Sequence, residues 1–470
     1  MRAFQFCLIG GLLSALTLAG CGGGHDAKTQ ATPPVAKPTA GDLEGLARWV
    51  LREPTATFRG DELREAGPEG LAALLTQAKS QGKLDATLDP LIDRVAGQRY
   101  ARHSRLYWYT DLEKAKARAR AEHKPVLSLR MLGDLRDDLS CANSRFFRVV
   151  LYPDPNVSAL LRSRFVLHWS SERPVPKVTV DYGDGRKLVR TVTGNSIHYV
   201  LDGNGRVIDA IPGLMDAMRF SFALNSSLEF YRQLDGSPDA LFSKRLFAHH
   251  TEREQTLLEA WKAELAALHI PVNSKDARAL DAQTSRLAAG RKTASTLPVP
   301  AAAAVPIAIG KGMVERRLVP VVAPLPTFTS NDLRERTAPE IWTRIAERHE
   351  KFERETKLSR ESRALMRELS PRALDARAEP IALDEAGFEA LVTRFEKILA
   401  VDTQRNRLEL SLSLHQRLAA FPNEDFRELN RWVYSTVFLT PRSDPWLGLT
   451  ADGVFTALPS DGIETAQIAP

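Results

Sequence analysis

The N-terminus of this chain limits how the rest of it can be held together. The segment that ends in Leu18-Ala19-Gly20-Cys21 is typical of a bacterial lipobox, in which the cysteine is lipidated and becomes the new N-terminus. Arg2 and the apolar run up to Leu18 complete the form of a secretory signal, and this run is too short for a permanent membrane span. We therefore expect residues 1–21 to take no part in the fold. The alternative is an ordinary cleaved signal that happens to contain a cysteine.

The three cysteines of the chain are then reduced to one. Cys7 leaves with the signal, Cys21 carries the lipid, and Cys141 alone remains as a thiol. An intramolecular disulfide and a cysteine-based metal site are both excluded in the mature chain. Hydrophobic residues make up 43% of the sequence, which permits ordinary hydrophobic cores.

The expected location is the periplasmic side of a bacterial membrane. A cysteine with two or three acyl chains gives stable anchoring. Gly22, rather than an aspartate, follows Cys21, and by resemblance to Gram-negative lipoproteins this favours the outer membrane. The net charge of +6 arises from 64 basic and 58 acidic side chains, a mixed surface that argues against a nucleic-acid partner. The expected partners are the membrane, through the lipid, and unidentified envelope proteins.

Helical spacing of apolar residues and Pro-rich stretches divide the chain into segments. The predicted segments are a signal peptide (1–21), a flexible tether (22–41), a helical cap (42–105), an α/β domain (106–234), a helical extension (235–295), a Pro/Ala-rich linker (296–328) and a helical C-terminal domain (329–470). Within the last segment, leucines alternate with period two over 408–414, which fits a strand or, given the helical pattern on both sides, a buried helix.

Residues 106–234 alternate between helical and strand signals. Asp111 is a suitable N-cap for a helix that ends at Lys124-Pro125. The turn Asp202-Gly203-Asn204-Gly205 lies between two strand-like runs and predicts a hairpin. The predicted helices and strands are 111–123, 126–129, 157–161, 164–169, 197–201 and 206–211. This order predicts a mixed sheet with helices on both faces.

The order of short motifs in this region resembles a thioredoxin-fold domain of the periplasmic type. A helix precedes Lys124-Pro125-Val126-Leu127, Cys141-Ala142-Asn143-Ser144 opens a second helix, and Gly194-Asn195-Ser196 leads into the hairpin. The resemblance covers residues 106–234 only. It implies an α/β thioredoxin-like domain with a mixed sheet and flanking helices, between an N-terminal helical segment and a mostly α-helical C-terminal domain.

The resemblance also implies a site at Cys141 and Ser144. These residues match the two positions of the family's Cys-x-x-Cys motif, and Ser144 replaces the second cysteine. A thiol at a helix N-terminus is favoured as a thiolate. A serine cannot attack a mixed disulfide, so a Cys-x-x-Ser site can capture a thiol or exchange disulfides but cannot complete dithiol oxidation alone.

Three departures from the family argue against an active oxidoreductase. Ser196 matches the family's cis-proline, and because a cis bond before a non-proline residue costs about 2.5–4 kcal/mol, we expect a trans bond here. Leu129 matches the family's buried acid. The loop before Cys141 carries Asp134, Asp137 and Asp138, whose charges would disfavour a thiolate. Cys141 is therefore either a buried small hydrophobic residue or the centre of monothiol chemistry.

Other candidate sites are weaker. His249-His250 has no ligand partner at metal-binding spacing and is interpreted as a solvated helix face, and His168 and His198 as packed or edge residues of strands. Neither a cofactor nor a metal is expected. The leading hypothesis is a non-catalytic binding or scaffold protein of the envelope. The alternatives are a monothiol thiol–disulfide oxidoreductase or isomerase that uses Cys141, and an accessory subunit of an envelope or secretion complex.

Overall fold

The computed structural model describes residues 41–52, 60–192, 194–234, 236–270, 333–350, 357–369, 372–374, 380–444 and 446. The predicted lipobox with Cys21, the tether up to residue 40 and the Pro/Ala-rich linker 296–328 lie outside these residues. Within the described part of the chain, no helix has the length and apolar character needed to cross a bilayer.

A mixed sheet lies at the centre of the molecule, and its strands follow the order β2-β1-β5-β6. β1 pairs with β2 in parallel and with β5 antiparallel, and β5 pairs antiparallel with β6. The bounds are β1 Val126–Leu132, β2 Val166–Arg173, β5 Ile197–Leu201 and β6 Val207–Pro212. Nearly every residue of β1, β5 and β6 is buried, as expected for strands covered on both faces. The predicted mixed sheet and the hairpin at 202–205 are confirmed.

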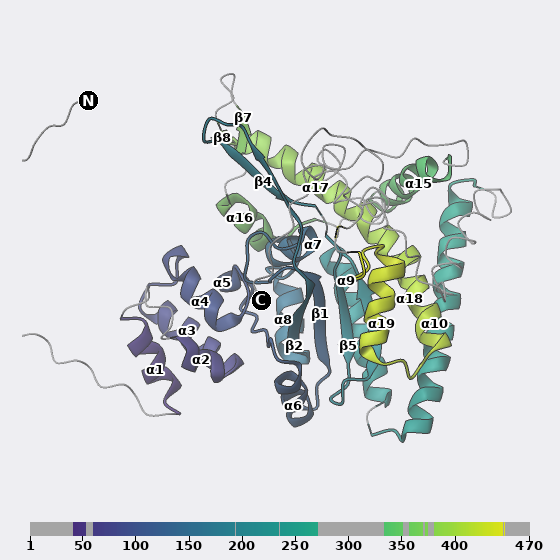
Figure 1. The fold of residues 1–470 in the computed structure, drawn as a ribbon, viewed down its shortest axis with the longest axis horizontal. Coiled ribbons are helices and arrows are strands. Elements are labelled where there is room, and N and C mark those ends of the chain that lie inside the picture. The colour runs from purple at the N-terminus through teal and green to yellow at the C-terminus, as the bar shows by residue number, and fades with distance from the viewer. Residues whose placement is uncertain are drawn as a thin grey trace, which may run out of the picture.

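Helices cover both faces of this sheet (Figure 1). Neighbouring residues of a strand point to opposite faces. On β5 the ring of His198 lies 5.0 Å from that of Phe220 on α9 (Ala217–Leu234), whereas the ring of Tyr199 lies 5.0 Å from that of Phe426 on α19 (Phe426–Trp432). The helices of the α/β region are α6 Leu112–Glu122, α7 Ala142–Phe146, η3 Phe147–Leu151, α8 Pro155–Arg164, α9 Ala217–Leu234 and α10 Asp239–Ala267. The side chain of Asp111 caps α6 as predicted, since it accepts hydrogen bonds from the backbone N–H groups of Glu113 and Lys114.

The N-terminal helices form a separate hydrophobic core on one side of the sheet (Figure 1). They are α1 Leu43–Val50, α2 Asp61–Glu65, α3 Pro68–Ser80, η2 Ala86–Leu88, α4 Asp89–Ala96 and α5 Ala101–Ser104. Trp169 of β2 connects this core to the sheet, because its indole N–H donates to the carbonyl oxygen of Gly97 at 2.9 Å. Along the chain, between β2 and β5, β3 Lys177–Asp181 and β4 Lys187–Thr191 form a separate two-stranded ribbon. β3 alternates exposed with half-buried residues, and β4 is mostly exposed or half-buried but ends in the buried Thr191.

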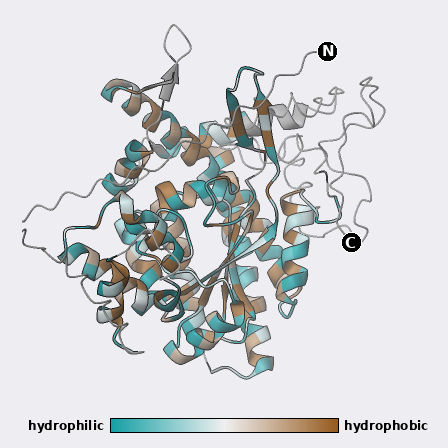
Figure 2. Ribbon diagram, turned by 60° about the vertical axis from the view of Figure 1, so that its left-hand side comes forward, coloured by the Kyte–Doolittle hydropathy of each residue, from teal (hydrophilic) through white to brown (hydrophobic). Residues whose placement is uncertain are grey.

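Part of the C-terminal helices shares one hydrophobic core with the sheet, whereas Trp342 and Ile345 of α15 (Leu333–Glu350) belong to a separate core with the end of α10. Leu410, Leu414, Leu429 and Tyr434 are buried in the same cluster as the strands, and Figure 2 shows hydrophobic residues recurring along the strands and the surrounding helices. The run 408–414 is helical, so the buried-helix alternative is confirmed. The elements are α15 Leu333–Glu350, α16 Arg360–Glu368, β7 Arg372–Leu374, β8 Pro380–Ala382, α17 Glu385–Arg405, η7 Asn406–Leu410, α18 Ser411–Ala420, α19 Phe426–Trp432 and η8 Val433–Val437.

Polar contacts fix these helices against the end of β6. The side-chain amide of Asn406 donates to the carbonyl oxygen of Leu214 at 2.7 Å, and the hydroxyl of Thr403 accepts from the backbone N–H of Asp216 at 2.9 Å. Gly213 allows this close approach, since its φ is +66° and a Cβ atom there would lie 2.4 Å from the Asn406 amide nitrogen. The C-terminal helices are thus positioned at the strand ends that carry the candidate site.

Candidate functional site

Cys141 lies at the N-terminus of α7, just after the loop that follows β1. Its backbone N–H donates to the carbonyl oxygen of Leu132, the last residue of β1, at 3.1 Å. Cys141 is the N-cap residue of α7, and its side chain is fully buried. The prediction that the thiol lies at the start of a helix is confirmed.

The three residues that the resemblance brings into one site lie together. The Sγ of Cys141 is 3.4 Å from the hydroxyl of Ser144 and 3.1 Å from the hydroxyl of Ser196. The Ser144 hydroxyl donates to the carbonyl oxygen of Cys141 at 2.8 Å and also lies 2.7 Å from the Ser140 hydroxyl. Among the described peptide bonds none is cis, so the expected trans bond before Ser196 is confirmed. The catalytic role of Cys141 and Ser144 remains a prediction.

A buried arginine lies beside the thiol. Arg148 bridges the backbone of Leu135, at 2.8 Å, and the hydroxyl of Ser140, at 2.9 Å, and it is 1% exposed. Burial lowers the pKa of Arg148 to about 10, although the phenol of Tyr100 and the carboxylate of Asp138 favour its charged form. Through its hydrogen bonds to Leu135 and Ser140, the guanidinium connects the loop before Cys141 to the helix after it.

The three aspartates of that loop each have a cationic partner. Asp134 pairs with Arg136, Asp137 lies 3.8 Å from Lys177, and Asp138 pairs with Arg99 at 2.9 Å. Each pairing offsets the negative charge that the sequence analysis expected to act on the thiol.

The C-terminal segment closes the site. The side-chain amide of Asn195 donates to the carbonyl oxygen of Phe438 and to the hydroxyl of Thr440, both at 3.1 Å, and the hydroxyl of Tyr434 donates to the carbonyl oxygen of Asn195 at 3.4 Å. Tyr434, Phe438 and Thr440 are all buried. A thiolate reacts only when its sulfur can reach a disulfide or an oxidant, and in this conformation the Cys141 side chain has no exposed surface.

A second polar cluster was missed by the sequence analysis. The interpretation of His249-His250 as a solvated face is wrong for His250, which is fully buried, and its Nδ1 lies 2.9 Å from Nδ1 of His415 on α18. Asp209 of β6 completes the group. One signal could have indicated this burial, because His250 continues the apolar stripe of Phe242 and Leu246 along α10. The partners at 209 and 415 could not be found by spacing.

Burial keeps both imidazoles neutral at neutral pH. It lowers the pKa of His415 to about 4 and that of His250 well below its usual range. Burial opposes the charge of Asp209, but the rings of His415 and His250 and the hydroxyl of Ser227 outweigh it and lower the pKa of Asp209. The cluster thus combines an ionised carboxylate with two neutral rings.

His168 and His198 are packed strand residues, as predicted. The Nδ1 of His168 lies 2.8 Å from the hydroxyl of Ser128, and Nε2 of His198 lies 2.7 Å from the hydroxyl of Tyr152. Burial lowers the pKa of each histidine to about 3. Both rings are therefore neutral parts of the core.

No family model matches the chain, and the comparison with curated proteins found no match. What the chain does must therefore be argued from its own residues.

Proposed function

We propose that this protein is a lipid-anchored envelope protein in which a thioredoxin-like domain serves as a non-catalytic binding scaffold. The observation that carries the proposal is the closed environment of Cys141, whose sulfur lies between Ser144 and Ser196 beneath the chain's own C-terminal segment. The lipobox that ends at Cys21 supports the anchor.

The thioredoxin-like assignment is supported by topology as well as by the sequence motifs. A β1–helix–β2 unit with parallel strands is followed by the antiparallel hairpin β5–β6 and then by α9. Cys141 starts the helix after β1, and Ser196 faces it from the loop before β5. The resemblance implies the same arrangement, in which the first cysteine of the motif lies opposite the position of the family's cis-proline.

The loss of catalysis follows from access and from the replaced cysteine. The hydroxyl of Ser144 cannot resolve a mixed disulfide. Cys141 belongs to a hydrophobic core that includes Tyr434 and Phe438, so a protein substrate could reach it only after the C-terminal segment had opened. The site that a redox enzyme would present to its substrate instead binds a segment of the same chain.

Thiol labelling of the native protein tests the proposal. With an aromatic disulfide reagent, Cys141 should react orders of magnitude more slowly in the native state than in denaturant. Ser80→Cys in a Cys141→Ala background supplies the matched control, because Ser80 is exposed at the end of α3 and should react at once. Fast labelling of native Cys141, together with reduction of a protein disulfide, would instead support the monothiol enzyme.

The anchor is tested separately from the thiol. In cells, Cys21→Ala should move the protein from the membrane fraction to the soluble periplasmic fraction, because a lipid anchor needs the cysteine. Membrane association that is unchanged in this variant would refute lipidation at Cys21. The scaffold proposal would then be decided by the labelling of Cys141 alone.

A further inference from the structure

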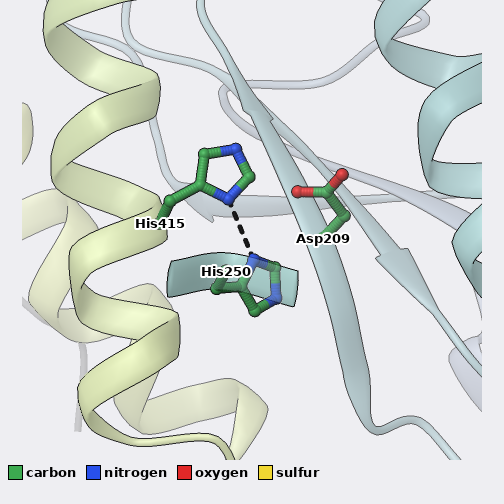
Figure 3. A group of neighbouring side chains, drawn as sticks. All are labelled: Asp209, His250 and His415. Carbon is green, nitrogen blue, oxygen red and sulfur yellow. Dashed lines mark hydrogen bonds between the residues drawn. The ribbon is translucent and has the colours of Figure 1, made fainter. Parts of the chain in front are cut away.

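The buried cluster of Asp209, His250 and His415 connects three parts of the fold. Asp209 lies on β6, His250 in the middle of α10 and His415 on α18 (Figure 3). One potential ligand atom from each residue lies within 4.8 Å of the others, and the three residues are 7%, 0% and 4% exposed. The cluster is formed where the C-terminal helix α18 contacts both α10 and β6.

Hydrogen bonds outside the cluster orient its side chains. The Nε2 of His250 lies 3.1 Å from the carbonyl oxygen of Ile208, and because a carbonyl can only accept, Nε2 carries the proton and Nδ1 keeps a lone pair. That lone pair faces the Nδ1 of His415 (Figure 3). The carboxylate of Asp209 accepts from the hydroxyl of Ser227 at 2.6 Å and from the backbone N–H of Ala210 at 2.8 Å. Metal ligands in proteins are oriented by outer hydrogen bonds of this kind.

Charge favours a cation at this place. A carboxylate in a protein interior requires a compensating charge or several hydrogen bonds. Among the described residues, no lysine or arginine forms an ion pair with Asp209. The rings beside its carboxylate belong to His250 and His415. Asp209 accepts two hydrogen bonds, and a divalent ion among the three side chains would in addition balance its negative charge.

We propose that Asp209, His250 and His415 bind a divalent first-row transition-metal ion, with Zn²⁺ as the reference ion. Two imidazole nitrogens and one carboxylate oxygen are the donor set of many Zn²⁺ and Fe²⁺ sites, whereas Ca²⁺ and Mg²⁺ prefer all-oxygen sites. Zn–N bonds of about 2.0–2.1 Å place two tetrahedral ligand nitrogens roughly 3.4 Å apart. The two Nδ1 atoms are 2.9 Å apart, so the rings need to separate by about half an ångström, and the proton that Nδ1 of His415 donates to Nδ1 of His250 has to move to Nε2 of His415 when the ion binds. A bound ion would fasten α18 and α10 to the sheet.

Cobalt substitution tests this site directly. The purified full-length protein, stripped with a chelator, should bind a single Co²⁺ per chain with visible d–d absorption, and Zn²⁺ should abolish that absorption. Zn²⁺ should also raise the melting temperature, because an ion that binds only the folded state stabilises it. Protein that remains folded by circular dichroism but shows neither the cobalt spectrum nor the thermal shift would overturn the proposal, and the three side chains would then be a hydrogen-bonded cluster without metal.

Matched variants separate this site from adventitious binding. Asp209→Asn and His250→Gln should lose the cobalt spectrum, whereas His249→Gln should keep it, because the ring of His249 stacks on Phe230 and lies outside the ligand group. If the two ligand variants fail to fold, Ser227→Ala serves instead, since it leaves all three ligands in place and should weaken Co²⁺ affinity about 10–100-fold. Equal Co²⁺ affinity in wild type and Ser227→Ala, or loss of binding in His249→Gln alone, would contradict the assigned ligand set.

Discussion

The side-chain amide of Asn195 donates a 3.1 Å hydrogen bond to the carbonyl oxygen of Phe438, which lies 243 residues further along the chain. Asn195 directly precedes Ser196, whose hydroxyl touches the thiol of Cys141. This bond therefore joins the C-terminal segment to the loop that faces the thiol.

Asn195→Ala should loosen this closure. The variant removes the donor to Phe438 and Thr440 and leaves a buried carbonyl oxygen without its partner, which costs about 1–3 kcal/mol. The free energy of unfolding in urea should fall by that amount, and native Cys141 should be labelled faster because local opening becomes easier. Asn225→Ala on the exposed face of α9 is the control and should change stability by less than about 0.5 kcal/mol. If stability falls while labelling is unchanged, residues 434–440 do not control access to the thiol.

Glu264→Gln should weaken the contact between α10 and α15. The Glu264 carboxylate lies 2.8 Å from Nε2 of His349 and 2.9 Å from the guanidinium of Arg348. Burial opposes the charge of Glu264, but the hydrogen bonds from His349 and Arg348 outweigh it and lower its pKa to about 2. Because the Arg348 side chain is 38% exposed, solvent screens the pair, and we expect a loss of about 1 kcal/mol at neutral pH.

The pH dependence of this loss has a defined sign. A depressed carboxyl pKa stabilises the folded state above the unfolded pKa of about 4.5, and this stabilisation disappears as the pH falls toward about 2. The unfolding curves of wild type and Glu264→Gln should therefore converge in acid. Glu259→Gln, at an exposed position of α10, should follow the wild type throughout. A difference between wild type and Glu264→Gln that persists at low pH would show that the variant acts through packing rather than charge.

Local signals were enough to predict the centre of the fold. The cap at Asp111, the buried run that starts at Val126 and the turn at 202–205 are each specified by neighbouring residues, and each was found. β1 extends to Leu132, whereas the prediction ended at 129. The prediction was too short because Arg130 interrupts the apolar pattern, but the backbone of Arg130 still pairs with Ser170. β3 and β4 were not predicted as strands, because both are largely polar and exposed.

Long-range packing could not be predicted in the same way. The leucines of 408–414 were predicted as a strand or a buried helix, but a helical pattern does not identify the surface that it covers. In the structure α18 and α19 join the core of the sheet, and Tyr199 of β5 donates to the side chain of Asn430 on α19 at 3.2 Å. Both the closure over Cys141 and the His250–His415 pair depend on this packing, so neither could be inferred from spacing along the chain.

Because of Asp93 on α4, we expect the free energy of unfolding to fall as the pH rises. Its side chain is 5% exposed and accepts a 2.9 Å hydrogen bond from the backbone N–H of Ala101, and the guanidinium of Arg99 lies 3.4 Å away. Burial outweighs these contacts and raises the pKa of Asp93 to about 7. The folded state therefore holds a proton that the unfolded chain has already lost above about pH 4, and folding becomes less favourable as the pH rises from about 4 to about 7.

Asp93→Asn isolates this effect, because asparagine keeps the acceptor for Ala101 but cannot ionise. The free energy of unfolding of the variant, relative to wild type, should rise by about 2–3 kcal/mol between about pH 5 and about pH 8. Urea unfolding at both pH values measures this change, and Glu44→Gln, at an exposed carboxylate of α1, should show none of it. A relative free energy that stays constant across this range would mean that Asp93 is already ionised in the folded protein at pH 5, with Arg99 and the backbone N–H groups compensating its charge.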